Sequence, residues 1–156
     1  MQARIKNPAA IVPDAMKAIL ALNAVTQRCD VPAKTLALCH QRASQINGCA
    51  ACIDMGVRSA RRDGETDDRL HAVAAWRHSP LFNEAERAAL ALTESVTLLA
   101  HETDPVPDEV WSEAAHHYNE VQLAGLLLSI ALTNMFNRLN VATRQVPGEW
   151  KPPVVA

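Results

Sequence analysis

The stretch "HSPLFNEAERAALALTESVTLLAH", residues 78–101, carries the clearest helix signals in the chain. Asn83 offers a side-chain oxygen that can cap free backbone N–H groups at a helix start. Glu84 and Glu86 place negative charge in the first turn, where the helix dipole favours it. Apolar residues then recur at helical spacing and form one side of the segment: Ala88, Leu90, Ala91, Leu92 and Val96. The stretch therefore predicts an amphipathic helix that begins near residue 83.

Comparable signals on either side of this segment predict further helices. Pro32 suits the first position of a helix, Asn47-Gly48 is typical of a helix end, and Thr66 offers another N-cap oxygen. Helices are expected over roughly residues 14–28, 32–47, 48–62, 66–76, 108–117 and 120–143. The chain has five glycines and no segment with alternating apolar residues. The sequence thus predicts an all-α fold, a single-domain helical bundle of about six to seven helices.

The length and composition are those of one ordinary globular domain. We expect a single domain over residues 1–156, with an N-terminal arm at about residues 1–13 and a proline-rich tail at about residues 146–156. Hydrophobic residues make up 49% of the chain and charged residues 21%, which is too apolar for a disordered protein. The formal net charge of -2 offers no basic surface to phosphate backbones, so no nucleic acid is expected as a partner.

Two segments bear on where the protein works. The N-terminal residues "MQARIKNPAAIVPDAMKAIL" lack the continuous apolar core and the small-residue cleavage site of a signal peptide. We therefore expect a cytoplasmic protein. The most apolar run, Leu123–Leu132, is interrupted by Gly125 and Ser129 and is far shorter than the ~20 residues that cross a membrane. It is interpreted as a buried helix, and no membrane is expected as a partner.

Four cysteines lie in the first third of the chain: Cys29, Cys39, Cys49 and Cys52. In a reducing cytoplasm such a group indicates metal binding, catalysis or burial more than a framework of structural disulfides. The stretch "SQINGCAACIDMG", residues 44–56, puts Cys49 and Cys52 three residues apart at the predicted start of a helix. A helix start favours the thiolate, and this spacing puts both sulfurs on one face. One sulfur can then react while the other closes a disulfide.

Two other interpretations of the pair stay open at this point. Two small apolar side chains can simply be buried in a core, as free cysteines often are. A zinc ion would need two more ligands, and Cys39 with His40 is a poor donor pair because neighbouring helical residues point in different directions. The redox interpretation is favoured over both, and no metal or other cofactor is expected.

Three segments of the chain resemble one known family: "SQINGCAACIDM" (residues 44–55), "GETDDRLHAVAAWRHSPLFNEAERAALALTE" (64–94) and "NMFNRLNVATRQVPG" (134–148). They are similar to the carboxymuconolactone decarboxylase superfamily, and within it to the alkylhydroperoxidase D-like branch, over roughly residues 30–145. The resemblance implies an all-helical fold, assembly into a homo-oligomer (dimer, trimer or hexamer), and a CxxC pair that reduces peroxides or serves as a dithiol redox centre. It also implies that Cys52 attacks the peroxide and that Cys49 resolves the product into a disulfide.

The sequence departs from the family pattern at two positions that matter for proton transfer. Active members usually have a glutamate twelve residues before the first cysteine and a histidine four residues after the second. Those positions here hold Ala37 and Gly56, so both groups of the expected proton relay are missing. Assistance from a general base is typically worth about 10²–10⁴-fold, so its loss predicts a slow peroxidase. His40, one turn after Ala37 on the preceding predicted helix, is the candidate substitute base.

The other thiols and polar side chains near the pair receive structural interpretations. Cys39 is expected to be packed in the core rather than to act as a third redox partner, and Cys29 to be a bystander. Asp54 is expected to face solvent or an arginine. Asn134 and Asn137 lie three residues apart in an apolar helix, where their amides need partners. We expect them to tie that helix to a neighbouring chain or to the cysteine helix.

The last long helix also favours assembly with further copies of the chain. Its apolar residues run nearly all the way round: Leu126, Leu127, Leu128 and Ile130. One subunit is not expected to cover all of them, which predicts a homo-oligomer.

The favoured function is that of an antioxidant oxidoreductase of the peroxiredoxin and alkylhydroperoxidase type. In this hypothesis a CxxC-dependent thiol peroxidase, weakened by the missing relay, reduces hydroperoxides. An external dithiol of the lipoyl or thioredoxin type is the expected reductant. The alternative is a dithiol redox sensor or disulfide-exchange protein with little peroxidase activity. Lactone decarboxylation is disfavoured because that branch generally lacks the CxxC pair, and a purely structural oligomer is the remaining interpretation.

Overall fold

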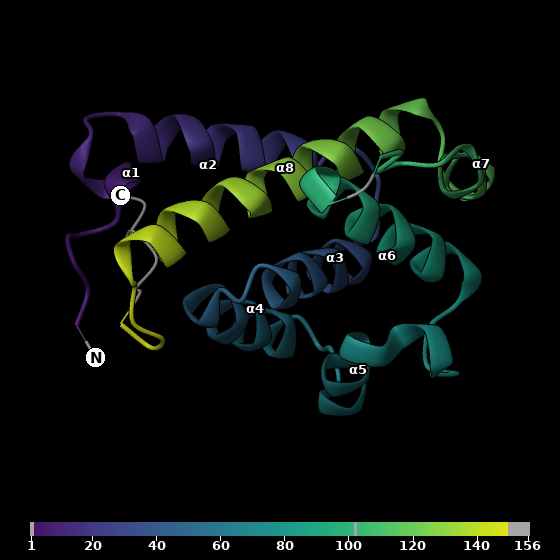
Figure 1. Cartoon of the computed structure of the whole chain (residues 1–156), viewed down its shortest axis with the longest axis horizontal. Coiled ribbons are helices and arrows are strands. Elements are labelled where there is room, and N and C mark those ends of the chain that lie inside the picture. The colour runs from purple at the N-terminus through teal and green to yellow at the C-terminus, as the bar shows by residue number, and fades with distance from the viewer. Residues whose placement is uncertain (1, 102, 150–156) are drawn as a thin grey trace.

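The structure is built from helices wherever it is described. The computed structural model describes residues 2–101 and 103–149, which contain eight α-helices, two short 3₁₀ helices and no strand (Figure 1). The elements are α1 (Pro8–Ile11), α2 (Ala15–Thr26), α3 (Ala33–Ile46), α4 (Ala50–Arg62), α5 (Asp67–Ala72), η1 (Val73–His78), α6 (Glu84–Thr97), η2 (Leu99–His101), α7 (Asp108–His117) and α8 (Glu120–Thr143). The predicted all-α, single-domain bundle is confirmed. The predicted number of helices was too low, because the single turn α1 lies within the expected N-terminal arm.

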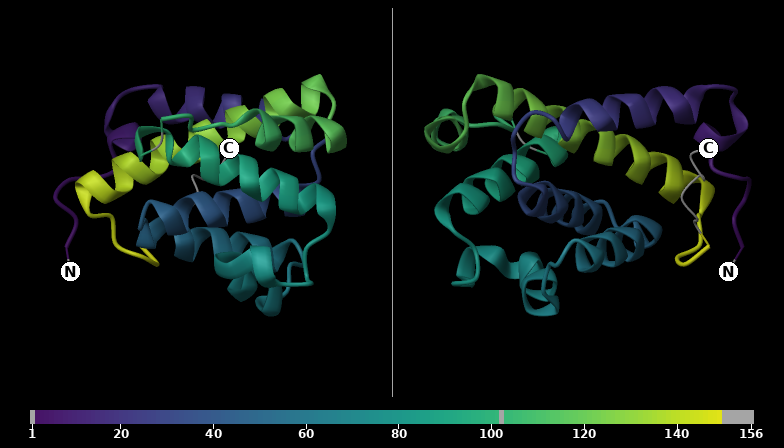
Figure 2. Two further views of the ribbon diagram at one scale, coloured as in Figure 1. Left: turned by 45° about the vertical axis from the view of Figure 1, so that its right-hand side comes forward. Right: turned by 180° about the vertical axis from the view of Figure 1, so that it is seen from behind.

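Helix α3 lies at the centre of the bundle, where it packs against α4, α6 and α8. Helices α3 and α4 form a hairpin, and α8 packs against both of them. Helix α2 runs alongside α8 on the side of the bundle away from α4 and α5 (Figure 1, Figure 2). This arrangement brings the start of α4 against the C-terminal half of α8.

Apolar side chains from the central helices form two core clusters. One cluster joins α3, α6, α7 and α8 and includes Leu36, Leu92 and Leu126. The other joins α3, α6 and η1 and includes Leu38 and Trp76. Each fully buried leucine contributes about 1.5–3 kcal/mol relative to an exposed one. Helix α3 contributes side chains to both clusters, so it is held firmly against α4 and α8.

The two predicted side-chain caps, Asn83 and Thr66, are both present. The Asn83 side chain accepts a hydrogen bond from the Glu86 N–H, and the Glu86 carboxylate accepts one from the Asn83 N–H, at 2.9 and 3.0 Å. Thr66 caps α5 as predicted. The prediction of a single helix over residues 66–76 is wrong, because α5 ends at Ala72 and the 3₁₀ helix η1 follows. Within that segment Ala75 leaves the helical region, with φ −127° and ψ 36°.

The N-terminal arm is tied to the end of α8. The Arg4 N–H donates to the Thr143 carbonyl at 2.9 Å, and Arg4 Nη1 donates to the Ala142 carbonyl at 3.0 Å. Gln145 Nε2 donates to the Ile5 carbonyl at 2.9 Å. Helix α1 begins directly after these contacts, with Asn7 as its N-cap. Residues 4 and 5 therefore lie beside the last turn of α8 (Figure 1).

The predicted proline-rich tail lies partly outside the described residues, which end at residue 149. The apolar run in α8 is buried as predicted at Leu123, Leu126, Ile130 and Leu132. Among the residues that the structure describes, no helix has the length and apolar character needed to cross a membrane.

Candidate functional site

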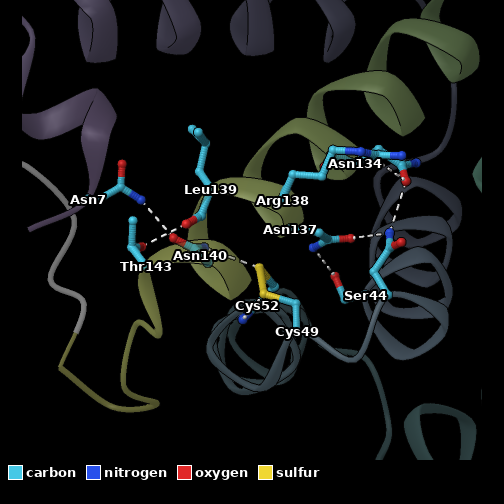
Figure 3. Close-up of a disulfide and its surroundings, with 11 residues drawn as sticks. Asn7, Ser44, Cys49, Cys52, Asn134, Asn137, Arg138, Leu139, Asn140 and Thr143 are labelled. Carbon is cyan, nitrogen blue, oxygen red and sulfur yellow. Dashed lines mark hydrogen bonds between the residues drawn. A yellow bond between two sulfur atoms is a disulfide. The ribbon is translucent and has the colours of Figure 1, made fainter. Parts of the chain in front are cut away.

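Cys49 and Cys52 are joined by a disulfide at the start of α4, with their Cα atoms 5.3 Å apart (Figure 3). Cys49 is the N-cap of α4, and its Sγ accepts a hydrogen bond from the Cys52 N–H at 3.4 Å. The predicted proximity of the two sulfurs is therefore confirmed. Cys49 is 1% exposed and Cys52 is 0% exposed, so neither sulfur is open to solvent in this state.

The turn that leads into α4 has a well-defined geometry. Gly48 adopts φ +62° after the end of α3, a conformation that glycine reaches without strain. Its N–H donates to the Gln45 carbonyl and the Cys49 N–H donates to the Ser44 carbonyl, which is the hydrogen-bond pattern of a Schellman motif. Cys49 thus closes one helix and opens the next. The predicted Asn47-Gly48 helix end produces this reversal.

Amide side chains of α8 fasten that turn. Asn47 Nδ2 donates to Asn134 Oδ1 at 2.9 Å and to Asn137 Oδ1 at 2.8 Å. Asn137 Nδ2 donates to Ser44 Oγ at 3.1 Å, and Asn137 is fully buried (Figure 3). The expectation that Asn134 and Asn137 tie the last helix to the cysteine helix is confirmed in this form, because they bind the turn from which that helix starts.

A third asparagine on α8, Asn140, contacts the redox pair directly. Its Nδ2 donates to Cys52 Sγ at 3.2 Å, and its Oδ1 accepts from Asn7 Nδ2 at 2.7 Å (Figure 3). The sequence interpretation did not identify Asn7 or Asn140. The available signal was the recurrence of asparagine every three residues along α8, which places Asn134, Asn137 and Asn140 near one side of the helix.

The His40 side chain, on α3, lies against Gly56 of α4. Gly56 is one helical turn after Cys52. A Cβ atom added to Gly56 would lie 2.7 Å from His40 Nδ1 and 2.8 Å from His40 Cε1. The imidazole therefore fills the space that a side chain at position 56 would need. Gln41 Oε1 also faces this point, at 2.9 Å; it is buried, and none of the residues that the structure describes donates a hydrogen bond to it. The structure thus places an imidazole beside position 56, where the family pattern has a histidine. Here the imidazole comes from His40 on α3 and not from a residue of α4.

The protonation state of His40 follows from its surroundings. Burial lowers its pKa from 6.5 to about 4, so the imidazole is neutral at pH 7 and has a lone pair available. Ala37 leaves no carboxylate at the other relay position. Asp54 does not replace it, because it accepts from Arg58 Nε at 3.0 Å and from the Gly148 N–H at 2.9 Å. The expectation that Asp54 faces an arginine is confirmed.

The remaining cysteines lie apart from the disulfide. Cys39 is 1% exposed, its Sγ donates to the Ala89 carbonyl at 3.8 Å, and burial raises the pKa of its thiol to about 12. It is packed in the core, as predicted. Cys29 is half-buried near the end of α2, where its Sγ donates to the Val25 carbonyl. Across the described part of the chain, no group of three or more His, Cys, Asp or Glu side chains is arranged to hold a metal ion.

Comparisons with known proteins agree with this geometry. The model of the carboxymuconolactone decarboxylase family matches residues 13–95. The uncharacterized protein YdfG of Bacillus subtilis is 37% identical over 132 residues, which is 85% of this chain and 88% of YdfG. The uncharacterized protein YnjA of Escherichia coli is 36% identical over 107 residues, which is 67% of this chain and 56% of YnjA.

Solved structures show the same fold. ATU0492 of Agrobacterium tumefaciens, a protein of unknown function provisionally assigned to antioxidant defence as AhpD, superposes with a TM-score of 0.86 and 33% identity over 94% of this chain and 98% of that one. The debrominase Bmp8, as a cysteine-to-alanine variant in complex with 2,3,4-tribromopyrrole, gives a TM-score of 0.76 and 25% identity over 86% of this chain and 71% of that one. The chain belongs to the carboxymuconolactone decarboxylase family, in its alkylhydroperoxidase D-like branch.

Proposed function

We propose that this protein is a thiol peroxidase in which Cys52 attacks a hydroperoxide and Cys49 resolves the product. The observation that carries the proposal is the buried disulfide at the start of α4, in which Cys52 Sγ also accepts a hydrogen bond from Asn140. The helix start and the amide donor both favour a thiolate at Cys52. The family and the disulfide together fit a redox role.

The proposed cycle moves two electrons. The Cys52 thiolate attacks one oxygen of ROOH, the O–O bond breaks, and one proton is taken up to give ROH and a sulfenic acid on Cys52. The Cys49 sulfur then attacks the Cys52 sulfur, an S–S bond forms, and the hydroxyl group leaves as water. An external dithiol, of the lipoyl or thioredoxin type, reduces the disulfide to two thiols and is itself oxidised to a disulfide. Each peroxide consumes one dithiol.

His40 is the proposed acceptor of the Cys52 proton. Its imidazole is neutral and lies beside Gly56, the position at which the family pattern has a histidine. A base with a pKa of about 4 is weaker than one poised near pH 7, and no carboxylate orients it. The proposal therefore keeps the expectation of a weakened peroxidase.

The burial of both sulfurs bears equally on a disulfide-exchange partner and on the external dithiol, because each must reach a sulfur atom to react. A pocket of about 360 Å³ lies beside the turn before Cys49, lined by Asn47, Asn137, Arg138, Val141 and Ala142. Its volume has room for a small hydroperoxide, and Asn47 and Asn137 in its lining belong to the contacts that fasten the turn before Cys49. The dithiol sensor or disulfide-exchange function stays the alternative, and the CxxC disulfide argues against lactone decarboxylation.

We also propose that the protein is a cytoplasmic homo-oligomer. Helix α2 is strongly apolar, yet Thr26 is its one buried residue, and Leu22 and Val25 are 39% and 42% exposed. On α8, Leu126 and Ile130 are covered within the chain and Leu128 is 39% exposed. The apolar faces of the described helices that we propose as the interface are therefore the Leu128 side of α8 and the exposed side of α2. A second copy of the chain would remove these side chains from water.

The test of the proposed function is the rate at which the reduced protein loses thiols to peroxide. Stopped-flow measurements with hydrogen peroxide and an organic hydroperoxide should show rapid oxidation that is abolished by Cys52→Ser. With Cys49→Ser the reaction should stop after one turnover, with a sulfenic acid on Cys52 that dimedone traps. His40→Ala should slow the reaction by about 10²-fold, while His71→Ala, at an exposed histidine on α5, should not.

A relocation variant tests the proton acceptor. Gly56→His in the parent lacks room, but in the His40→Ala background it should restore a large part of the lost rate, because it returns an imidazole to this part of the site from α4. If the parent reacts no faster than free thiols with either peroxide, the sensor or exchange function becomes the better explanation of the disulfide.

The debrominase similarity makes 2,3,4-tribromopyrrole a second electron acceptor to assay, with bromide release as the readout.

A further inference from the structure

We propose that Asn140 is a catalytic residue that holds the Cys52 thiolate by direct donation, and that Asn7 of the N-terminal arm is the positioning residue that aims its amide. The proposal rests on the proposed function in taking Cys52 as the reacting sulfur. It makes the first residues of the chain part of the redox site, although Asn7 and Cys52 lie on different helices and far apart in the sequence.

The direction of each hydrogen bond in this chain of contacts follows from its first member. The Ala9 N–H can only donate, and it donates to Asn7 Oδ1 at 2.9 Å. The other end of the Asn7 side chain is then an NH₂ group, which can only donate, and it reaches Asn140 Oδ1 at 2.7 Å. This leaves the Asn140 NH₂ group facing Cys52 Sγ at 3.2 Å. A backbone N–H of α1 thus fixes which end of Asn140 meets the sulfur.

Both asparagines are held on elements that are themselves anchored. Asn140 is half-buried in the last turns of α8, and Asn7 is half-buried as the N-cap of α1. The arm before Asn7 is tied to the same end of α8 by Arg4 and by Gln145. The contact to Cys52 therefore does not depend on a free side chain finding its place.

The partners of the charged and titratable groups near Cys52 show why the Asn140 amide matters for the stability of a thiolate. From α3 the nearby titratable group is His40, which is neutral at pH 7. On α4, Asp54 and Arg58 pair with each other. On α8, Arg138 binds Asn134, and in the arm Arg4 binds a carbonyl of α8. Each of these charged groups is engaged with another partner, so the helix start and Asn140 supply the stabilisation of a thiolate.

The same donor acts in both halves of the cycle. A hydrogen bond to the charged form favours that form, so donation from Asn140 raises the fraction of Cys52 that is thiolate when peroxide arrives. During reduction, an external thiolate attacks Cys49 Sγ, the S–S bond breaks, and the electron pair leaves on Cys52. The stabilised thiolate is then the better leaving group.

The experiment measures the pH at which Cys52 becomes a thiolate, from the absorbance at 240 nm of reduced protein with Cys52→Ser as the baseline. Asn140→Leu should move the midpoint upward by about one pH unit, and nearly isosteric Asn140→Asp further, because it also adds a negative charge. Asn7→Asp keeps the cap on Ala9 but presents only acceptors, so the Asn140 amide should turn and place its oxygen on the sulfur. Its midpoint should rise as well. Asn23→Asp, on the exposed part of α2, is the charge-matched control and should leave the midpoint unchanged.

The outcomes separate this proposal from the proposed function. The titration needs no peroxide, so it reports on Asn140 even if the parent proves inert to hydroperoxides. Folding of each variant is checked by far-UV circular dichroism, and Asn140→Asp serves if Asn140→Leu does not fold. A midpoint equal to the parent's in a folded Asn140 variant would overturn the role of Asn140. A midpoint that moves for Asn140→Leu but not for Asn7→Asp would overturn the role of the arm.

Discussion

The contact between His40 and Gly56 predicts that the two positions are strongly coupled in stability. Adding a methyl group by Gly56→Ala improves helix propensity by about 1 kcal/mol. The same methyl group would lie 2.7 Å from His40 Nδ1 and 2.8 Å from His40 Cε1. Overpacking of this kind typically costs about 1–3 kcal/mol. Gly56→Ala should therefore destabilise the parent by roughly 1 kcal/mol, or lower its Tm by about 2–4 °C.

Removal of the imidazole should reverse the sign of the effect. In the His40→Ala background the remaining close atom is Gln41 Oε1, the far end of a flexible side chain that can move aside. Gly56→Ala should then stabilise the protein by about 1 kcal/mol, as expected for an unhindered helix position. The coupling energy between the two substitutions would be about 1–3 kcal/mol.

A double-mutant cycle by urea denaturation, followed by circular dichroism at 222 nm, measures this coupling. All variants are compared in the oxidised state and at one protein concentration, because oligomerisation would shift apparent stability. The control cycle replaces His40→Ala by His71→Ala and should give no coupling beyond the usual error of about 0.3–0.5 kcal/mol. A Gly56→Ala variant that is more stable than the parent by its full helix propensity would refute the packing that we describe.

Three further outcomes are expected. After reduction of the native protein, Cys49 and Cys52 should become available to alkylation while Cys39, whose pKa burial raises to about 12, stays unmodified at pH 8; peptide mass spectrometry checks both. Stability should rise with pH between about 4 and 6.5, because burial lowers the pKa of His40 from 6.5 to about 4 on folding and the unfolded chain binds more protons in this window. Urea titrations across that range should show a smaller slope for His40→Ala, and equal slopes would count against it. Light scattering should give a mass that is a multiple of 17.0 kDa, and Leu128→Glu should lower it, whereas a monomeric parent would remove the proposed interface.

Local signals were sufficient to predict most of the helices. The Asn83 and Glu86 capping box and the Thr66 cap act within one turn, so the sequence contains both partners. The single turn α1 was missed because four residues show no helical period, although Asn7 followed by Pro8 is a typical start. The break after Ala72 depends on packing against the core, which propensity does not report.

The candidate site was predictable only where its parts are close in the sequence. The Cys49–Cys52 pair follows from a spacing of three residues in a helix start. The Asn7–Asn140–Cys52 contacts join segments 133 and 88 residues apart, and only the attachment of the N-terminal arm to α8 and the packing of α4 on α8 bring them together. Likewise, His40 could be placed one turn after Ala37, but its approach to Gly56 depends on how closely α3 and α4 pack.

The two attachments of the CxxC segment to α8 have a consequence for the sulfenic acid of the proposed peroxidase cycle. Asn47 holds the turn before Cys49, and Asn140 holds the Cys52 sulfur, through hydrogen bonds that do not involve the S–S bond. Opening the disulfide therefore leaves both thiols near their places, and well-oriented groups of this kind reach effective molarities of about 10⁵–10⁸ M. In the proposed peroxidase cycle, closure of the disulfide by Cys49 should then be faster than attack by a second molecule of peroxide, and Cys52 should be protected from irreversible overoxidation to the sulfinic acid.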